Sequence, residues 1–171
     1  MKKTLGRIDI LINNAGTTVF VPLNELDNLL EEHWDRTLAV NVKGVFFVSR
    51  ACADELRKNR GAIINITSIA GFNGAGSSIA YAASKAAGNS LTRSFAKVLA
   101  PEVRVNSIAP GIVNTRWVGG QEEHIKRYSN GTPLGRIADP ADIADMVWAV
   151  ISGGDFVPGQ TIIVDGGWMM T

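Results

Sequence analysis

Three side chains in the middle of this sequence have types and a spacing that suit proton transfer. Ser68 directly follows an apolar run, Tyr81 lies thirteen residues further on, and Lys85 follows Tyr81 by four residues. On a helix, residues four apart share a face, so Lys85 can hold a positive charge near the Tyr81 phenol. A free tyrosine has a pKa of about 10, and a nearby cation lowers it. We therefore expect Tyr81 to exchange a proton near working pH with a substrate oxygen that Ser68 holds.

The spacing of these residues also has a plainer interpretation. A tyrosine and a lysine four apart occur by chance on many exposed helices, and a serine at the end of a strand is often a turn residue. The elements that carry the three residues, and the other motifs around them, must decide between the two interpretations.

Alternating strands and helices are predicted along the whole chain. Short apolar runs at 8–12, 62–67, 103–108 and 160–164 predict strands, and periodic stretches at 31–58, 78–100, 121–128 and 139–151 predict helices. Because helices separate the strands, the strands should pair in parallel through right-handed crossovers. The pattern predicts one α/β domain over residues 1–171, a parallel sheet with helices on both faces. Ligands bind beyond the carboxyl ends of such strands, here after Ile12, Thr67 and Ile108.

The bulk composition excludes several classes of function. The 171 residues carry a formal net charge of +1, which gives no basic field for nucleic acid or a membrane surface. No run approaches the roughly 18 apolar residues of a membrane span. The single cysteine, Cys52, excludes a disulfide within the chain, so we expect a reducing cytoplasm. His33 and His124 have no ligand cluster around them, and we expect no metal site.

The motifs, taken in order, resemble those of the short-chain dehydrogenase/reductase family. Ser68 and Tyr81-Ala82-Ala83-Ser84-Lys85 resemble its serine and its Tyr-x-x-x-Lys signature. Further motifs match in order: Asn13-Asn14-Ala15-Gly16 after the first strand, Asn41 in a helix, Pro110-Gly111-Ile112-Val113-Asn114-Thr115, and Val164-Asp165-Gly166-Gly167. The resemblance covers essentially the whole chain. The overall pattern most resembles 3-oxoacyl-carrier-protein reductases and tropinone-reductase-like enzymes.

The resemblance implies a three-layer Rossmann-like fold and an NAD(P)-dependent oxidoreductase that interconverts a carbonyl and a secondary alcohol. Tyr81 would be the general acid and base, and Lys85 would lower its pKa and bind the nicotinamide ribose. Ser68 would orient the substrate oxygen, and Asn41 would support a water in a proton relay. The implied cofactor-binding residues are Asn13, Ala15, Gly16, Tyr81, Lys85, Gly111, Val113 and Thr115.

Some residues keep a second interpretation beside the implied one. Asn13 and Asn14 could form a turn that ties neighbouring strands, and the Asn41 amide could cap a local kink. The segment from Trp117 to Tyr128 matches a substrate loop of the family and would cover a partly apolar carbonyl or alcohol. The alternative is that this segment is a packed surface helix. The helices at 31–58 and 78–100 correspond to those that pair in family dimers and tetramers, so a homo-oligomer is expected.

The sequence departs from the family at its beginning. The family starts with a strand, a glycine-rich turn and a helix whose N-terminus receives the pyrophosphate. We find no such turn here, and residues 71–76, although glycine-rich, follow Ser68 on the substrate side. We therefore expect an incomplete fold whose strand at 8–12 is an exposed apolar edge, with NADP or NAD as the cofactor. The alternative is an inactive homologue that acts as an oligomerisation or interaction module.

Overall fold

Four parallel strands form the central sheet, in the order β1-β2-β3-β4. The computed structural model describes residues 4, 6–119 and 122–171. The strands are β1 (Ile10–Asn13), β2 (Ala62–Ile66), β3 (Arg104–Pro110) and β4 (Thr161–Val164). The predicted parallel α/β architecture is confirmed, and the strand limits differ from the predicted ones by at most two residues.

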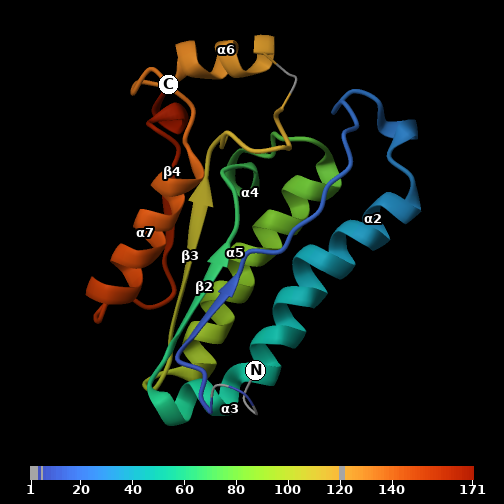
Figure 1. Ribbon diagram of the computed structural model, residues 1–171. Helices are drawn as coiled ribbons and strands as arrows, with labels where there is room; N and C mark the ends of the chain where they lie inside the picture. The colour runs from blue at the N-terminus through green and yellow to red at the C-terminus, as the bar shows by residue number, and fades with distance from the viewer. Residues whose placement is uncertain (1–3, 5, 120–121) are drawn as a thin grey trace.

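Helices cover the two faces of the sheet unequally. On one face lie α2 (Glu31–Leu38), α3 (Val45–Asn59) and α5 (Ile79–Leu99), and on the other lies α7 (Pro140–Gly153) (Figure 1). The core on the first face includes Leu56, Ile63 and Leu99, whereas the core under α7 includes Ile64 and Val147. Successive residues of β2 thus point to opposite faces, and both faces are apolar because both carry a helical layer.

Short helices lie near the carboxyl ends of the strands. The turn α4 (Ala70–Asn73) follows β2, and α6 (Glu122–Gly131) lies at the top of the view in Figure 1. Single 3-10 turns occur at Leu26–Asn28 and Trp168–Met170. The sequence predicted α6, although Gln121, where the predicted helix began, lies outside the described residues. None of the helices in the described ranges is long and apolar enough to cross a membrane.

The predicted helical stretch at 31–58 is confirmed, but its middle is not an α-helix. Between α2 and α3 the chain forms the wider turn η2 (Ala39–Gly44), a π-helix that contains Asn41. The Asn41 side chain exchanges two hydrogen bonds of 2.9 Å with the backbone of Thr17, and it donates a third to Ser84 Oγ. Wider helical turns of this kind are frequent at functional sites. Here the wide turn lets the Asn41 side chain bond both the loop at Thr17 and the helix that carries Ser84.

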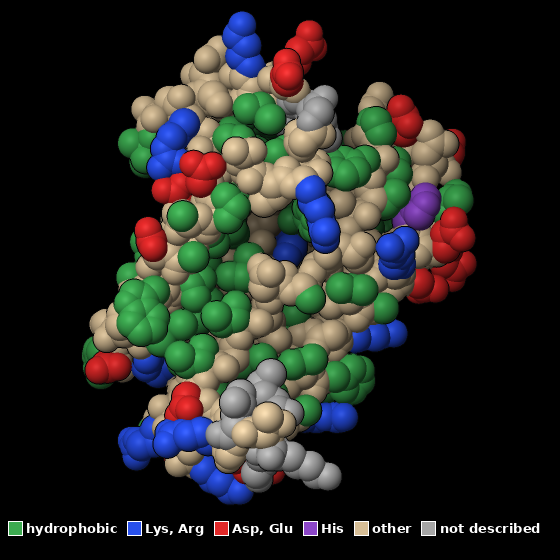
Figure 2. Space-filling view, viewed as in Figure 1, with side chains coloured by type: hydrophobic (Ala, Val, Ile, Leu, Met, Phe, Trp, Pro, Cys, Tyr) green, Lys and Arg blue, Asp and Glu red, His purple; other side chains and the backbone are tan. Residues whose placement is uncertain are grey.

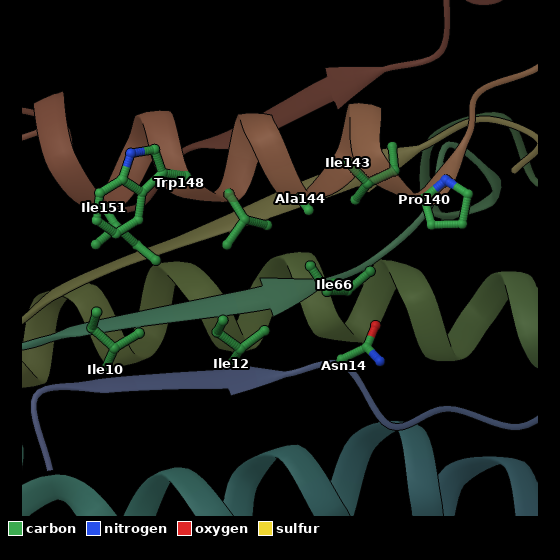
Figure 3. Close-up of a pocket in the computed structure, with 10 residues that line it drawn as sticks. Ile10, Ile12, Asn14, Ile66, Pro140, Ile143, Ala144, Trp148 and Ile151 are labelled. Atoms are coloured by element: carbon green, nitrogen blue, oxygen red, sulfur yellow. The ribbon is translucent and has the colours of Figure 1, made fainter.

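The strand β1 lies at the edge of the sheet, as predicted. Ile10 is 41% exposed and Ile12 is 47% exposed. Between them and α7 runs an open groove of about 640 Å³ whose walls include Ile143 and Trp148 (Figure 3). Because α7 packs over β2, β3 and β4, the β1 side of that face keeps no helical cover in the described part of the chain.

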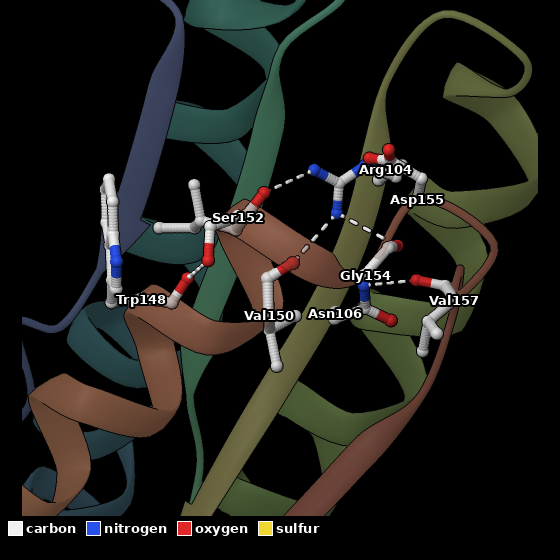
Figure 4. Close-up of polar contacts among 9 residues, drawn as sticks. Arg104, Asn106, Trp148, Val150, Ser152, Gly154, Asp155 and Val157 are labelled. Carbon is white, nitrogen blue, oxygen red and sulfur yellow. Dashed lines mark hydrogen bonds and ion pairs between the residues drawn. The ribbon is translucent and has the colours of Figure 1, made fainter.

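Arg104, the first residue of β3, fixes the end of α7. Its guanidinium donates to the carbonyl oxygens of Val150 (3.0 Å), Ile151 (2.8 Å) and Gly154 (3.1 Å) (Figure 4). These carbonyls belong to the last turn of the helix, where partial negative charge accumulates and internal partners run out. The cation therefore caps α7 from the neighbouring strand.

Arg104→Met is expected to destabilise the fold by about 1.5–3 kcal/mol, because it leaves three carbonyl oxygens without their charged donor while keeping most of the apolar stem. Urea unfolding followed by circular dichroism measures the change. The matched control is Asp155→Asn, since Asp155 is 94% exposed and lies 3.7 Å from Arg104 Nε. That control should change stability by less than about 0.5 kcal/mol. Equal stability of both variants would contradict the capping role.

Candidate active site

The residues predicted to do chemistry meet at the carboxyl ends of β1 and β2. Ser68 lies two residues after β2, and Tyr81 and Lys85 lie in the first two turns of α5. Ser78 begins that helix: its hydroxyl accepts a hydrogen bond of 3.2 Å from the Tyr81 backbone amide. This N-cap fixes the phase of α5, and so decides that Tyr81 and Lys85 share the face turned toward Ser68. The surface beside this edge is hollowed, with a Lys or Arg side chain at the floor (Figure 2).

Ser68 and Lys85 both lie near Tyr81. The Ser68 side chain is close enough to the Tyr81 phenol to act on its pKa, which it lowers. The Lys85 ammonium lies 5.5 Å from the centre of the Tyr81 ring and donates a hydrogen bond of 2.9 Å to the carbonyl oxygen of Ile66. Lys85 is buried, so its charge is held in place by the end of β2 instead of by water. The predicted triad is thus brought together.

The direction of the Tyr81 pKa differs from the prediction. Burial raises the pKa of Tyr81 above its ordinary value, and the hydrogen bond from Ser68 only opposes this. Burial also lowers the pKa of Lys85 from 10.5 to about 8. The sequence pattern predicted that the lysine cation dominates, but the low polarity around both groups outweighs it, since burial disfavours phenolate and ammonium alike. At neutral pH the phenol keeps its proton.

Asn41 joins the loop after β1 to α5. Besides its bonds to Thr17, its Nδ2 donates to Ser84 Oγ at 2.9 Å, and Ser84 Oγ in turn donates to the Tyr81 carbonyl oxygen at 2.7 Å. A Cβ on Gly16 would lie 3.6 Å from Asn41 Oδ1 and 3.7 Å from Lys85 Nζ. The side chains of Asn41 and Lys85 therefore approach each other at Gly16. The bonds of Asn41 within and beside the wide turn agree with the capping interpretation. Its support of a water in a proton relay stays a prediction.

Asn13 has a structural role that the alternative interpretation described. Its Nδ2 donates to Asn65 Oδ1 on β2 at 2.8 Å and to Ser49 Oγ on α3 at 3.0 Å. Asn65 continues the chain by donating to Thr92 Oγ1 at 2.9 Å. With both amide hydrogens used inside the protein, Asn13 ties β1 to β2 and to α3. This network holds the turn that presents Ala15 and Gly16 to solvent.

The segment after β3 contributes backbone instead of side chains. The bridge to Ala138 uses the carbonyl oxygen of Ile112 and the amide of Asn114, so Val113's own amide takes no part in it. Gly111 packs against β4, because a Cβ there would lie 2.9 Å from Asp165 Cβ. Thr115 is exposed, and its hydroxyl accepts a long bond of 3.4 Å from the Trp117 amide.

The described residues fit the nicotinamide end of a dinucleotide. Lys85 makes one hydrogen bond to Ile66 and keeps further N–H donors, Gly16 leaves open space before it, and Val113 leaves an unengaged backbone amide. The glycine-rich residues 71–76 do not fit a phosphate, since the amides of residues 70–75 already donate to acceptors within residues 68–73.

One of the two histidines has a structural role. His33 Nδ1 accepts a hydrogen bond of 3.1 Å from the Leu30 amide and so caps α2. The His124 side chain lies outside the described residues. Over the ranges that the structure covers, no three His, Cys, Asp or Glu side chains cluster as metal ligands.

Two contacts of the site were not predicted from the sequence. Trp117 packs edge-on against the Tyr81 ring with 6.3 Å between ring centres, and Ser84 links Asn41 to α5. Ser84 lies inside the Tyr-x-x-x-Lys motif, three residues after Tyr81, which places it one turn along the helix. That spacing could have indicated it, whereas nothing near Trp117 in the sequence indicates which ring it meets.

Known proteins resemble this chain in sequence and in fold. The family described as enoyl-(acyl carrier protein) reductase matches residues 1–169. Cyclopentanol dehydrogenase from Comamonas testosteroni is 37% identical over 168 residues, and 3-oxoacyl-(acyl-carrier-protein) reductase from Thermotoga maritima is 38% identical over 166 residues. Each alignment covers 95% of this chain and 66% of the relative, so the chain spans about two thirds of their length.

A solved structure resembles the chain over nearly its whole length. The crystal structure of a gluconate 5-dehydrogenase from Burkholderia cenocepacia in complex with NADP and tartrate superposes with a TM-score of 0.91 at 32% identity. The match covers 99% of this chain and 68% of that one. The likeness therefore extends over both faces of the sheet and over the carboxyl edge that carries Ser68, Tyr81 and Lys85.

Proposed function

The chain belongs to the short-chain dehydrogenase/reductase family of oxidoreductases, and we propose that it interconverts a carbonyl and a secondary alcohol with NADP or NAD. One observation carries the proposal: the hydroxyl of Ser68, the phenol of Tyr81 and the ammonium of Lys85 lie together at the carboxyl edge of the sheet. Family membership alone does not assign a reaction, so the proposal depends on this geometry.

The proton transfer follows from the positions of these three groups. The nicotinamide, when bound, supplies or accepts the hydride. Ser68 and Tyr81 both hydrogen-bond the substrate oxygen, and Tyr81 gives up its phenolic proton as negative charge develops there. Lys85, fixed by Ile66, stabilises the phenolate that remains. Because the pKa of Tyr81 is raised, the phenol starts as an acid, which suits reduction of a carbonyl.

The cofactor would contact the chain where backbone groups are accessible and not already hydrogen-bonded. We assign the nicotinamide ribose to Tyr81 and Lys85, and the ring to the backbone of Val113 and neighbouring Thr115. Asn13, Ala15, Gly16 and Gly111 would border it, with Asn13 and Gly111 acting through the backbone that they fix. A solved relative binds NADP, which supports a dinucleotide without deciding between NADP and NAD.

The proposal is tested by turnover. The purified protein is incubated with NADPH or NADH and a panel of ketones, and the loss of reduced nicotinamide is followed by absorbance. Consumption that requires both the ketone and the cofactor supports the proposal. A folded protein that consumes neither cofactor with any ketone of the panel contradicts it.

Trp117 is placed to act on the choice of substrate. Its indole is 39% exposed and meets the Tyr81 ring edge-on, so a group attached to the substrate carbonyl would pack against it. We propose a partly apolar carbonyl or alcohol as the substrate. Trp117→Ala is expected to lower kcat/KM about tenfold for a ketone with a flat aromatic substituent and much less for acetone. Trp148→Ala, which removes an indole from α7, is the matched control; equal losses for both ketones would contradict this role of Trp117.

We also propose that the protein is a cytoplasmic homo-oligomer. Phe47 on α3 is 49% exposed and Val98 on α5 is 66% exposed. Both helices pack against the sheet, and these two side chains are left uncovered. A second copy would cover them, because apolar side chains gathered on one surface favour association. Light scattering is expected to give a mass of at least two chains, and Phe47→Glu is expected to lower it. A monomeric wild-type protein would contradict this proposal.

A further inference from the structure

The glycine-rich residues 71–76 lie directly against the catalytic part of α5. A Cβ on Gly71 would stand 2.7 Å from the Lys85 carbonyl carbon and 2.8 Å from the Ala86 amide nitrogen. Real side chains do not approach backbone this closely, so only glycine lets α4 rest on the peptide group of Lys85. The contact is backbone on backbone, and no flexible side chain can move aside to relieve it.

The far end of the same segment touches the ring of Tyr81. A Cβ on Gly76 would lie 3.4 Å from Tyr81 Cδ1 and 3.2 Å from the Cβ of Ala70. Gly76 also has a φ of +139°, a conformation that side chains disfavour. The backbone of residue 76 therefore lies beside one edge of the phenol ring, where a side chain would meet the ring.

The segment is tied to Ser68 by its own hydrogen bonds. The Ala70 amide donates to Ser68 Oγ at 3.1 Å, and the Gly71 amide donates to the Ser68 carbonyl oxygen at 3.1 Å. The next amides continue the turn, with Phe72 donating to Ile69 and Gly74 donating to Ala70. The segment thus moves as a unit, and a displacement at Gly71 would carry the Ser68 hydroxyl with it.

We propose that Gly71 and Gly76 are positioning residues, which set the distance between the Ser68 hydroxyl, the Tyr81 phenol and the Lys85 ammonium. This inference rests on the proposed function, since it assigns those three groups to the reaction. Gly71 places the segment at a fixed depth on α5, and Gly76 leaves free the space beside the phenol ring that a side chain would fill. The glycines that resemble a phosphate loop in the sequence therefore serve the proton-transfer groups.

The test measures the ionisation of Tyr81 directly and needs no cofactor. The sequence has two tyrosines, so in a Tyr128→Phe background the ultraviolet absorbance of tyrosinate reports Tyr81 alone. Gly71→Ala should separate Ser68 from the phenol and so raise the pKa of Tyr81, because the hydrogen bond from Ser68 lowers it. Gly153→Ala is the matched control, since a Cβ there meets nothing within 4 Å. Circular dichroism verifies that each variant is folded.

A double-substitution cycle separates positioning from general disturbance. Ser68→Ala alone should raise the pKa of Tyr81, and Gly71→Ala should add no further rise in the Ser68→Ala background. If Gly71→Ala does not fold, Gly76→Ala takes its place in the cycle, with the same expected direction. An unchanged or lowered pKa of Tyr81 in the folded variant, or equal effects with and without Ser68, would overturn the proposal. A protein without turnover in which the cycle still holds would contradict the proposed function and leave the positioning intact.

Discussion

Tyr81→Phe is expected to lower turnover by about 10²–10⁴-fold while leaving the fold intact, because it removes the phenolic proton that the proposed mechanism gives to the substrate oxygen. The ring keeps its place between Trp117 and the backbone of Gly76, so its packing does not change. The loss should appear in kcat, since the phenolic proton matters most in the transition state. Steady-state kinetics with the preferred ketone measure it.

The control for this substitution is the other tyrosine. Tyr128→Phe leaves a ring stacked on Trp168 with 4.4 Å between ring centres and should keep nearly normal turnover. Thermal unfolding should give similar midpoints for both variants. Near-normal turnover of Tyr81→Phe would defeat the mechanism, whatever the cause of the residual activity.

Lys85→Met is expected to abolish turnover and to make the protein more stable at neutral pH. The buried ammonium has a pKa of about 8 against 10.5 when unfolded, which corresponds to about 3 kcal/mol of unfavourable burial. Methionine fills a similar volume without charge, and the lost bond to the Ile66 carbonyl offsets about 1 kcal/mol of the gain. The free energy of unfolding of Lys85→Met should therefore be about 1–2 kcal/mol higher than that of the wild-type protein. Such a gain is expected where a group that serves function destabilises the fold.

The pH dependence of that gain has a definite sign. Between pH 8 and 10.5 the unfolded lysine binds a proton that the folded one has largely released, so wild-type stability rises with pH across this window. The advantage of Lys85→Met is therefore full below about pH 8 and shrinks as the pH rises toward 10.5. Urea unfolding at several pH values measures this. Lys97→Met, at an exposed site on the same helix, is the matched control for the loss of a lysine from α5. A destabilised Lys85→Met at neutral pH would contradict the account.

The sequence predicted the sheet and the meeting of the candidate site residues for one physical reason. Buried parallel strands are short and continuously apolar, and the residues that follow them must converge at one edge. Ser68 and Gly16 could therefore be placed from the strands before them, and Lys85 from its distance to Tyr81 along one helix. Such inferences need only local periodicity and chain order.

Other features depended on contacts that no local pattern contains. The wide turn at Asn41 arises from its bonds to Thr17 and Ser84, which are distant in sequence. The direction of the Tyr81 pKa depends on how deeply the ring is buried, and spacing to Lys85 does not report burial. The role of Gly71 appears only when α4 is seen lying on α5.

The central claim is that Tyr81 and Lys85 form a working nicotinamide site, and a binding titration tests it most directly. NADPH and NADH are titrated into the protein and into Lys85→Met while nicotinamide fluorescence is followed. We predict saturable binding to the wild-type protein and weaker binding to the variant, since Lys85 would hold the ribose. A folded protein that binds neither nucleotide, or binds equally well without Lys85, would contradict the claim and would favour an interaction role for this chain.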